Sequence, residues 1–309
     1  MQQHTKNPIR FSLKHWFNIG KLVIKKNEED NTSLVAAGVA FYFLLALFPL
    51  LGSLISLYGI FLDPDSLNEH LNYVVGFMPA QSHYIIEDQI KALTNTDNTA
   101  LGFGFVSGLL LSVWSSGKGA DALIVACNIT YMQKKARSFF GRIFTRIKIT
   151  VSLILMIVVV VGLLVILPIA VSIIAGDIEL EWLLRLVKWA ITITIFVLAL
   201  CALYRNAPNR RHAQWQWVAP GAVAASVFWI ILSFLFNIYI SEYASYNKTY
   251  GSVGGVIVLL MWFYLTAYII LIGSAINAAC ELYTKYDTTV GETKPIGERG
   301  AVVADTSDF

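Results

Sequence analysis

Two charged side chains, Lys118 and Asp121, interrupt an apolar stretch that continues to Tyr131. A lone charge at the bilayer centre costs roughly 2.5–3.5 kcal/mol on insertion scales, so such groups pair or face water. Residues three apart share one helix face and can neutralise each other. Together with Ser115 and Ser116, they predict a polar patch that lines a substrate path. The alternative, which the residues leave open, is that Lys118 lies near the inner membrane boundary and snorkels into the headgroups.

A second polar set, Arg205, Asn206 and Asn209, follows a later apolar stretch. Guanidinium, ammonium and amide groups together can bind the oxygens of an anionic headgroup. If this set meets Lys118 and Asn128, the cluster is a candidate substrate-binding site for such a headgroup. The favoured alternative is that the arginines of this segment only set the orientation of the chain in the membrane.

The sequence contains no pattern that predicts hydrolytic or cofactor chemistry. A catalytic metal site needs clustered His and acidic ligands, but the five histidines are scattered without paired spacing: His4, His15, His70, His83 and His212. A nucleophile elbow, a P-loop and a dinucleotide-binding glycine pattern are not found. The three cysteines lie far apart in apolar runs, which is typical of inert buried thiols. We expect no cofactor, no metal and no enzymatic activity.

The composition indicates whether the chain folds in water or in a membrane. Of the 309 residues, 56% are hydrophobic and only 14% are charged, against roughly 25% charged in soluble domains. A water-soluble enzyme needs more charge to cover its surface. The net charge of +3 is too small to indicate a polyanion-binding protein.

Long apolar runs dominate the chain, and a helix needs ~20 such residues to cross a bilayer. Six candidate spans can be recognised: about 33–62, 99–127, 149–176, 182–204, 215–241 and 250–281. Because they show no strand alternation, they predict helices, which satisfy their own backbone hydrogen bonds in lipid. The expected fold is an all-α polytopic membrane protein with six transmembrane helices, forming a membrane domain over residues 31–284.

Basic and acidic loops alternate along these six spans. The segments before the first span, after the second and after the fourth are basic, and the others are acidic or nearly neutral. By the positive-inside rule, both termini are cytoplasmic. Residues 1–30 predict an amphipathic helix on the inner surface, and residues 66–96 predict two short helices near the outer interface. Residues 285–309 are polar and predict a flexible tail.

Four motifs, in order, resemble the YihY/BrkB family of bacterial inner-membrane proteins, once named ribonuclease BN. They cover roughly residues 29–280: Glu29-Asp30-Asn31 with Ala36 to Tyr42 and Leu47 to Leu50; Trp114 to Gly117 with Asn128; Leu203 to Asn209 with Trp217, Pro220 to Ala222 and Trp229; and Tyr250 to Gly254 with Trp262, Tyr264 and Gly273 to Ala278. Family members often carry Glu near the end of the last span, where this chain has Ala275; Glu281 lies one to two turns further on. The resemblance implies a six-helix membrane protein and no settled activity.

Two functions therefore compete. The first is a permease or flippase-like transporter of an anionic, lipid-related amphiphile, because polar groups lie within long membrane helices. The second is a non-catalytic membrane scaffold or envelope-integrity protein. Ribonuclease activity finds no support, because the positive-inside rule accounts for every basic residue between Lys134 and Lys148. The expected partners are membrane lipids and not nucleic acid, and a homo-oligomer is left open.

Overall fold

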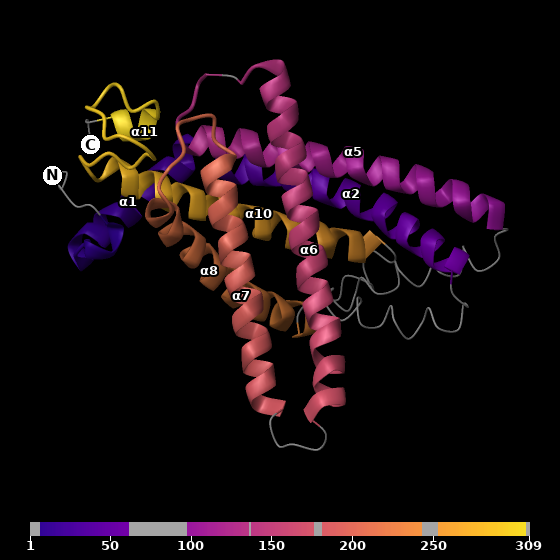
Figure 1. The fold of residues 1–309 in the computed structure, drawn as a ribbon. Helices are drawn as coiled ribbons and strands as arrows, with labels where there is room; N and C mark the ends of the chain where they lie inside the picture. Colours follow the sequence, from indigo (N-terminus) through magenta and orange to yellow (C-terminus); the bar gives the residue numbers. More distant parts are fainter. Residues whose placement is uncertain (1–6, 62–97, 136, 176–180, 243–252, 307–309) are drawn as a thin grey trace. The chain divides into compact units, whose positions relative to one another are not determined.

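A computed structural model describes residues 7–61, 98–135, 137–175, 181–242 and 253–306. Within these residues nearly all of the regular structure is helical, and Ala213 and Thr289 form an isolated β-bridge. The six long helices in the described part are α2 (Thr32–Phe61), α5 (Asn98–Thr130), α6 (Phe139–Ala175), α7 (Glu181–Asn206), α8 (Trp215–Glu242) and α10 (Val253–Leu282) (Figure 1). The shorter ones are α1 (Leu13–Glu29) and α11 (Val302–Asp305). The expected all-α membrane architecture is confirmed.

Five helical segments of the described chain are long and apolar enough to cross a bilayer: Thr32–Ser53, Gly102–Thr130, Trp189–Asn206, Trp215–Ile240 and Gly254–Leu282. Each overlaps one predicted span. The sixth predicted span, 149–176, lies almost entirely within α6, a continuous helix whose side chains are described only in part. The two interfacial helices expected within 66–96 lie outside the described residues.

The chain divides into two compact units. Unit 1 comprises Met1–Thr32, Leu123–Phe228 and Ile269–Phe309, and unit 2 comprises Ser33–Ala122 and Trp229–Tyr268. Three helices, α5, α8 and α10, divide between the two units, and the first residue of α2, Thr32, belongs to unit 1.

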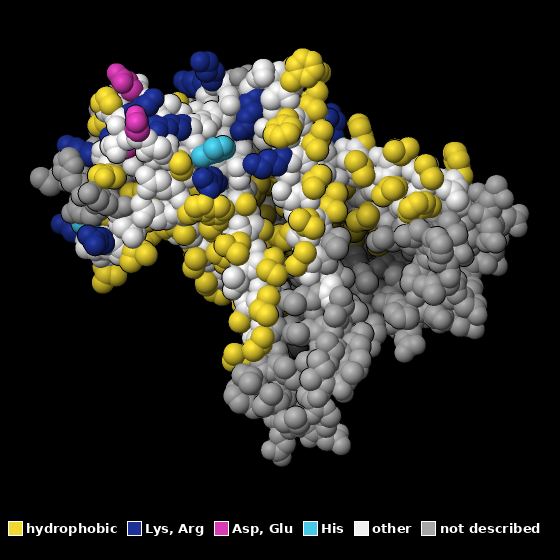
Figure 2. All heavy atoms as spheres, viewed as in Figure 1, with side chains coloured by type: hydrophobic (Ala, Val, Ile, Leu, Met, Phe, Trp, Pro, Cys, Tyr) yellow, Lys and Arg dark blue, Asp and Glu magenta, His cyan; other side chains and the backbone are white. Residues whose placement is uncertain are grey.

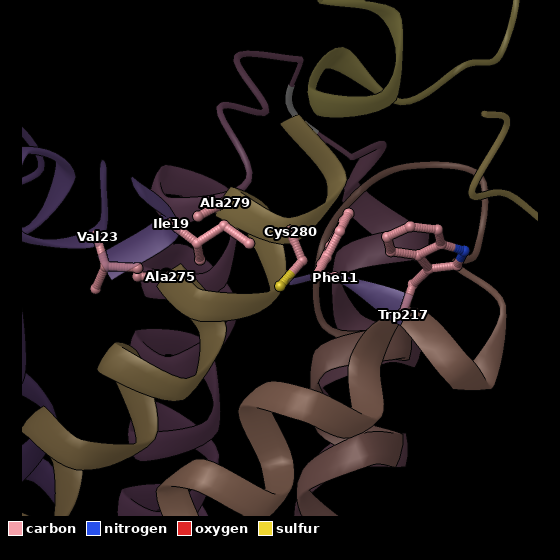
Figure 3. Packing of buried hydrophobic residues seen from close by; sticks show 7 residues of the cluster. All are labelled: Phe11, Ile19, Val23, Trp217, Ala275, Ala279 and Cys280. Carbon is pink, nitrogen blue, oxygen red and sulfur yellow. The ribbon is translucent and has the colours of Figure 1, made fainter. Parts of the chain in front are cut away.

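In unit 1, α1 packs on the end of α10 and the start of α8. Phe11, just before α1, and the buried α1 residues Ile19 and Val23 contact a cluster formed by Trp217, Ala275, Ala279 and Cys280 (Figure 3). The Phe11 ring lies edge-on to Trp217, with centroids 6.2 Å apart, and edge-on to Tyr283 at 5.9 Å. The expected N-terminal amphipathic helix is thus present, and part of its apolar surface is used inside the protein.

Unit 2 joins α2 to α5 and α8 to α10 by close contacts. The Ser53 hydroxyl of α2 donates a hydrogen bond to the Phe105 carbonyl of α5 at 3.2 Å. On the other pair, the rings of Phe236 and Trp262 lie 5.1 Å apart, and the Trp229 indole N–H donates to Thr266 Oγ1 at 3.2 Å.

Residues 285–306 differ from the flexible tail that their composition predicted. They fold back along unit 1, where the Gln214 N–H donates to the Thr288 carbonyl and the Val290 N–H to the His212 carbonyl. Val303 is fully buried against Tyr131, Ala278 and Leu282. A polar composition predicts flexibility when order depends on apolar burial, but here most of the segment is held by hydrogen bonds.

The surface of unit 1 is apolar along its helices and basic at one end. Figure 2 shows apolar side chains along α7, of which Leu186, Trp189 and Leu198 are exposed. Lys and Arg side chains gather near the end of α7 that leads into α8.

Candidate functional site

The most unusual group in unit 1 is a buried ion pair between Arg210 and Glu281. Glu281 lies in the last turn of α10, and Arg210 lies in the connection from α7 to α8. The guanidinium donates two hydrogen bonds to the carboxylate, Nη1 to Oε2 at 2.8 Å and Nη2 to Oε1 at 2.6 Å. Both side chains are fully shielded from solvent. Because neither charge can reach water, each depends on the other.

Two further residues complete this pair. The Thr288 hydroxyl donates to Glu281 Oε2 at 2.6 Å, so the carboxylate accepts three hydrogen bonds. The Tyr131 ring, at the end of α5, lies under the guanidinium with 4.1 Å between Arg210 Cζ and the ring centroid. Burial alone would lower the pKa of Arg210, but the charge of Glu281 and its hydrogen bonds, together with Tyr131 and Cys127, outweigh the burial and the pKa is raised. Arg210 therefore stays protonated at every physiological pH.

The C-terminal segment that supplies Thr288 is itself held by buried polar groups. Asp287 accepts hydrogen bonds from the Thr289 N–H and hydroxyl and from the Lys294 N–H. Burial would raise the pKa of Asp287, but these bonds and the Arg299 charge lower it below its ordinary value. Arg299 donates to four backbone carbonyls between residues 285 and 304. The segment is therefore a fixed cover over this end of unit 1.

Helix α8, which follows Arg210 in the sequence, and α10, which carries Glu281, pack closely against each other. A Cβ atom on Gly221 would meet the Gly273 carbonyl oxygen and would lie 2.7 Å from the Asn277 side chain. Asn277 bridges the two helices, because its Oδ1 accepts from the Gly221 N–H at 2.7 Å and its Nδ2 donates to the Val218 carbonyl at 2.9 Å. Only glycine allows this approach, since any side chain would need the backbones to separate.

The three amides predicted to bind a headgroup are engaged within unit 1. Asn128 Oδ1 accepts from the Asn209 N–H at 2.7 Å, and Asn209 Nδ2 donates to the Lys135 carbonyl at 2.8 Å. Asn206 Oδ1 accepts from Lys148 Nζ at 3.0 Å. The structure thus brings Asn128 and Asn209 together, and it uses both to join the end of α5 to the loop after α7.

Arg137 strengthens the same junction. Its guanidinium donates to the carbonyls of residues 206, 207 and 208 at 3.1, 3.0 and 2.8 Å. These carbonyls lie at the end of α7 and just beyond it, where a helix leaves carbonyl acceptors without partners within the helix. Burial lowers the pKa of Arg137. The side chain therefore fixes the connection from which Arg210 extends.

Arg205 has a different position from the amides beside it. It is half-buried, and its Cζ lies 4.7 Å from the Trp215 ring centroid, within the usual range of a cation–π contact. His212 Nδ1 is hydrogen-bonded to the Arg205 carbonyl at 3.0 Å. At this end of α7, Arg205 therefore contacts Trp215, and its neighbour Asn206 contacts Lys148.

Lys118 and Asp121, with Ser115 and Ser116, belong to unit 2. Lys118 Nζ lies 5.7 Å from the Trp114 ring centroid, and the Ser116 hydroxyl donates to the Val113 carbonyl at 3.1 Å. Asp121 and Ser115 are buried. The predicted cluster of Lys118 with Arg205 would join residues of different units, and it stays a prediction.

Sequence reasoning missed the buried pair itself. It assigned Arg210 to membrane orientation and noted Glu281 only as a possible replacement for an acid at position 275. One available signal was that Glu281 is the only acid in the last predicted span and its immediate flank, from 249 to 286. Among the described residues, no three His, Cys, Asp or Glu side chains gather in a way that could hold a metal ion.

Comparison with known proteins agrees with this architecture. The family described as Virulence factor BrkB matches residues 23–296. The chain is similar to a putative ribonuclease-like protein, YfkH, of Bacillus subtilis, with 34% identity over 250 residues that cover 79% of this chain and 88% of that protein. It also resembles a UPF0761 membrane protein of Idiomarina loihiensis, with 30% identity over 97 residues, 31% of this chain and 34% of the relative.

A UPF0761 membrane protein of Vibrio cholerae is 34% identical over 87 residues, which cover 27% of this chain and 29% of that one. No solved structure matches the chain. The family match covers most of the sequence, including the pair Arg210 and Glu281. With its apolar helices, this chain is an integral membrane protein that belongs to the BrkB family.

Proposed function

We propose that the protein is a permease or flippase-like transporter of the bacterial inner membrane. Its substrate is an anionic, lipid-related amphiphile, and it performs no catalysis on it. Both chain ends lie in the cytoplasm, because the basic residues concentrate in the N-terminal segment and in the connections that follow α5 and α7. Nucleic acid is not a partner in this proposal, since membrane orientation accounts for the basic residues.

The observation that carries this proposal is a group of cations beside exposed apolar side chains at one end of α6 and α7. Lys148 is exposed on α6 and contacts Asn206, the neighbour of Arg205. Trp215 is 49% exposed beneath Arg205, and Phe144 is 72% exposed one turn before Lys148. An anionic amphiphile offers the complementary chemistry, because its headgroup pairs with cations while its chains contact the apolar surface.

Ionisable groups within the spans add support of a second kind. Membrane proteins seldom keep such groups in spanning segments without a use for them. Here Lys118 and Asp121 lie in α5, and Glu281 ends α10. We assign Lys118, Asp121, Ser115 and Ser116 to the path of the substrate. Arg205, with Lys148, binds its headgroup, and the amides Asn128, Asn206 and Asn209 hold that site in place.

The test is a lipid-translocation assay with purified protein in vesicles. The vesicles carry phosphatidylglycerol with a fluorescent group on one acyl chain, and dithionite bleaches the label in the outer leaflet. We expect bleaching to exceed that in protein-free vesicles. The double variant Lys148→Gln/Arg205→Gln and the single variants Lys118→Ala and Asp121→Asn should lose this excess, whereas the matched exposed pair Lys134→Gln/Lys135→Gln should keep it.

Equal bleaching with and without protein would overturn translocation of this substrate. Normal bleaching in all three test variants would overturn the assignment of the path and headgroup residues. Each variant is first checked for insertion and for its elution volume in detergent, so that loss of activity is separated from loss of the protein.

A scaffold is the second candidate, and the packing of α8 on α10 favours it. The Gly221 and Gly273 contact and the engaged amides make a rigid junction rather than an open path. Lipid profiles of membranes with and without the protein discriminate between the two functions. A change in the amount of an anionic lipid supports transport, and unchanged lipids together with protein partners recovered by crosslinking support a scaffold.

A further inference from the structure

The exposed face of α1 is a second apolar surface, distinct from the face that packs inside unit 1. Leu13 is 89% exposed, Phe17 is 65% exposed and Ile24 is 65% exposed, and Gly20 is exposed between them. With 3.6 residues per turn, these four positions fall within about 60° of one another around the helix. They form a narrow stripe, which we call the outer stripe.

The outer stripe is flanked by lysines along one edge. Lys14, Lys21 and Lys25 are exposed and lie about 80–120° around the helix from Leu13. Lys21 Nζ is 4.7 Å from the Phe17 ring centroid, so one of these cations lies directly beside the stripe. Acidic residues follow only at the C-terminal end of the helix, where Glu29 pairs with Lys25 at 3.6 Å.

Another face of α1, about 80–120° around the helix from Leu13 on the side away from the lysines, is fixed to the membrane-spanning part of unit 1. Ile19 and Val23 pack against Ala275 and Ala279 of α10. In addition, Asn18 Nδ2 donates to the Tyr283 hydroxyl at 3.1 Å. The outer stripe therefore has a defined direction relative to the end of α10, which is itself the end of a candidate span.

We propose that the outer stripe is a docking surface for an anionic bilayer, in which Leu13, Phe17 and Ile24 enter the headgroup boundary and Lys14 and Lys21 contact lipid phosphates. Charge complementarity selects this occupant, because an apolar stripe with a lysine edge matches a negatively charged leaflet. Since α1 also packs on the end of α10 that carries Glu281, one face of α1 would contact the anionic leaflet and another would contact α10. This inference does not depend on transport.

The experiment places a reporter on the stripe itself. Gly20→Cys offers a site where an added Cβ meets nothing within 4 Å, and the three native cysteines are buried. The full-length protein, labelled there with an environment-sensitive fluorophore, is reconstituted into vesicles of phosphatidylcholine alone or of phosphatidylcholine and phosphatidylglycerol in equal parts. Nitroxide-bearing lipids report contact of the label with the bilayer.

We expect blue-shifted emission and nitroxide quenching in the mixed vesicles, and weaker effects in phosphatidylcholine. Each lysine at an anionic surface contributes about a fivefold factor, so Lys14→Gln/Lys21→Gln should lower the ratio of docked to undocked helix about 25-fold. The matched variant Lys134→Gln/Lys135→Gln removes two exposed lysines elsewhere and should leave the signal unchanged.

Three results would overturn the proposal. The first is equal emission in both vesicle types, and the second is an equal effect of the two double variants. The third is energy transfer between labelled copies that replaces the nitroxide quenching, because a second copy of the chain would then cover the stripe.

Discussion

Removing one partner of the ion pair between Arg210 and Glu281 should destabilise the protein strongly. In Glu281→Leu, the Arg210 guanidinium would stay buried without its carboxylate. Both side chains are fully shielded, so water cannot replace the two lost hydrogen bonds of 2.6 and 2.8 Å. Breaking such a pair costs about 3–5 kcal/mol. Unit 1, which holds the pair, falls in the size range of about 150–250 residues, where each kcal/mol shifts the melting temperature by about 2–4 °C, so its melting temperature should fall on the order of 10 °C.

Replacing the whole group should restore most of this loss. In Arg210→Met/Glu281→Leu/Thr288→Val, no buried charge or hydroxyl lacks its partner, and apolar side chains of similar size occupy the space. Such replacements are often neutral or stabilising, because the desolvation of two ions is avoided. We expect the triple variant to melt within a few degrees of the parent, about 1 kcal/mol, while Arg210→Met alone behaves like Glu281→Leu.

The assay uses chemistry that the chain already contains. The native thiols of Cys127, Cys201 and Cys280 are buried, so a thiol-reactive dye that fluoresces on coupling reports unfolding of the detergent-solubilised protein. Glu29→Ala is the control, since it breaks an exposed pair with Lys25 and should change the melting temperature little. A triple variant as unstable as Glu281→Leu, or a single variant that melts like the parent, would refute this reasoning.

Three further predictions concern unit 1. Gly221→Ala should cost at least about 1–3 kcal/mol and lower accumulation in the membrane, because its methyl group has no space beside Gly273. Asp287→Asn should lower stability at pH 7, since the folded pKa of Asp287 lies below its ordinary value of 3.8. This contribution is complete above 3.8 and is lost as the pH falls through the folded pKa, so melting curves of parent and variant should converge in acid. Arg137→Ala should remove the side-chain donor from three carbonyls at the end of α7 and raise amide hydrogen exchange in residues 206–211.

Controls for these variants come from the same chain. Gly38→Ala lies in α2, where an added Cβ meets nothing within 4 Å, and it should leave stability unchanged or slightly raised. Asp305→Asn changes a carboxylate of the same segment that accepts hydrogen bonds from the backbone N–H groups of residues 297 and 299. A constant difference between Asp287→Asn and the parent down to strong acid would contradict the assigned pKa, and unaltered exchange in Arg137→Ala would contradict its clamping role.

Much of the fold could be predicted because bilayer thickness leaves few choices. Apolar runs such as 215–241 and 250–281 are long enough to span, and only helices satisfy their backbones in lipid. The same reasoning could not find the order of residues 285–306. Their stability comes from specific hydrogen bonds of Asp287 and Arg299, and composition does not report such bonds.

The candidate site was less accessible to sequence reasoning, for a geometric reason. Arg210 and Glu281 are 71 positions apart, so no helical spacing relates them, and each charge alone had an ordinary explanation. The amides were found, but their engagement could not be foreseen. Asn128 and Asn209 meet each other across 81 positions, whereas spacing rules predict contacts only within one helix.

The core of unit 1 also constrains how the protein is made. Phe11, just before α1, and Ile19 of α1 pack with Ala279 of α10, and Thr288 closes the ion pair from beyond α10. During synthesis, α1 leaves the ribosome long before its partner surface exists. Its apolar inner face must wait, shielded by a chaperone or by the lipid surface, until α10 has been synthesised. Unit 1 therefore cannot complete its packing until Thr288 has been made, and a chain shortened before Thr288 would be inserted but left unfinished.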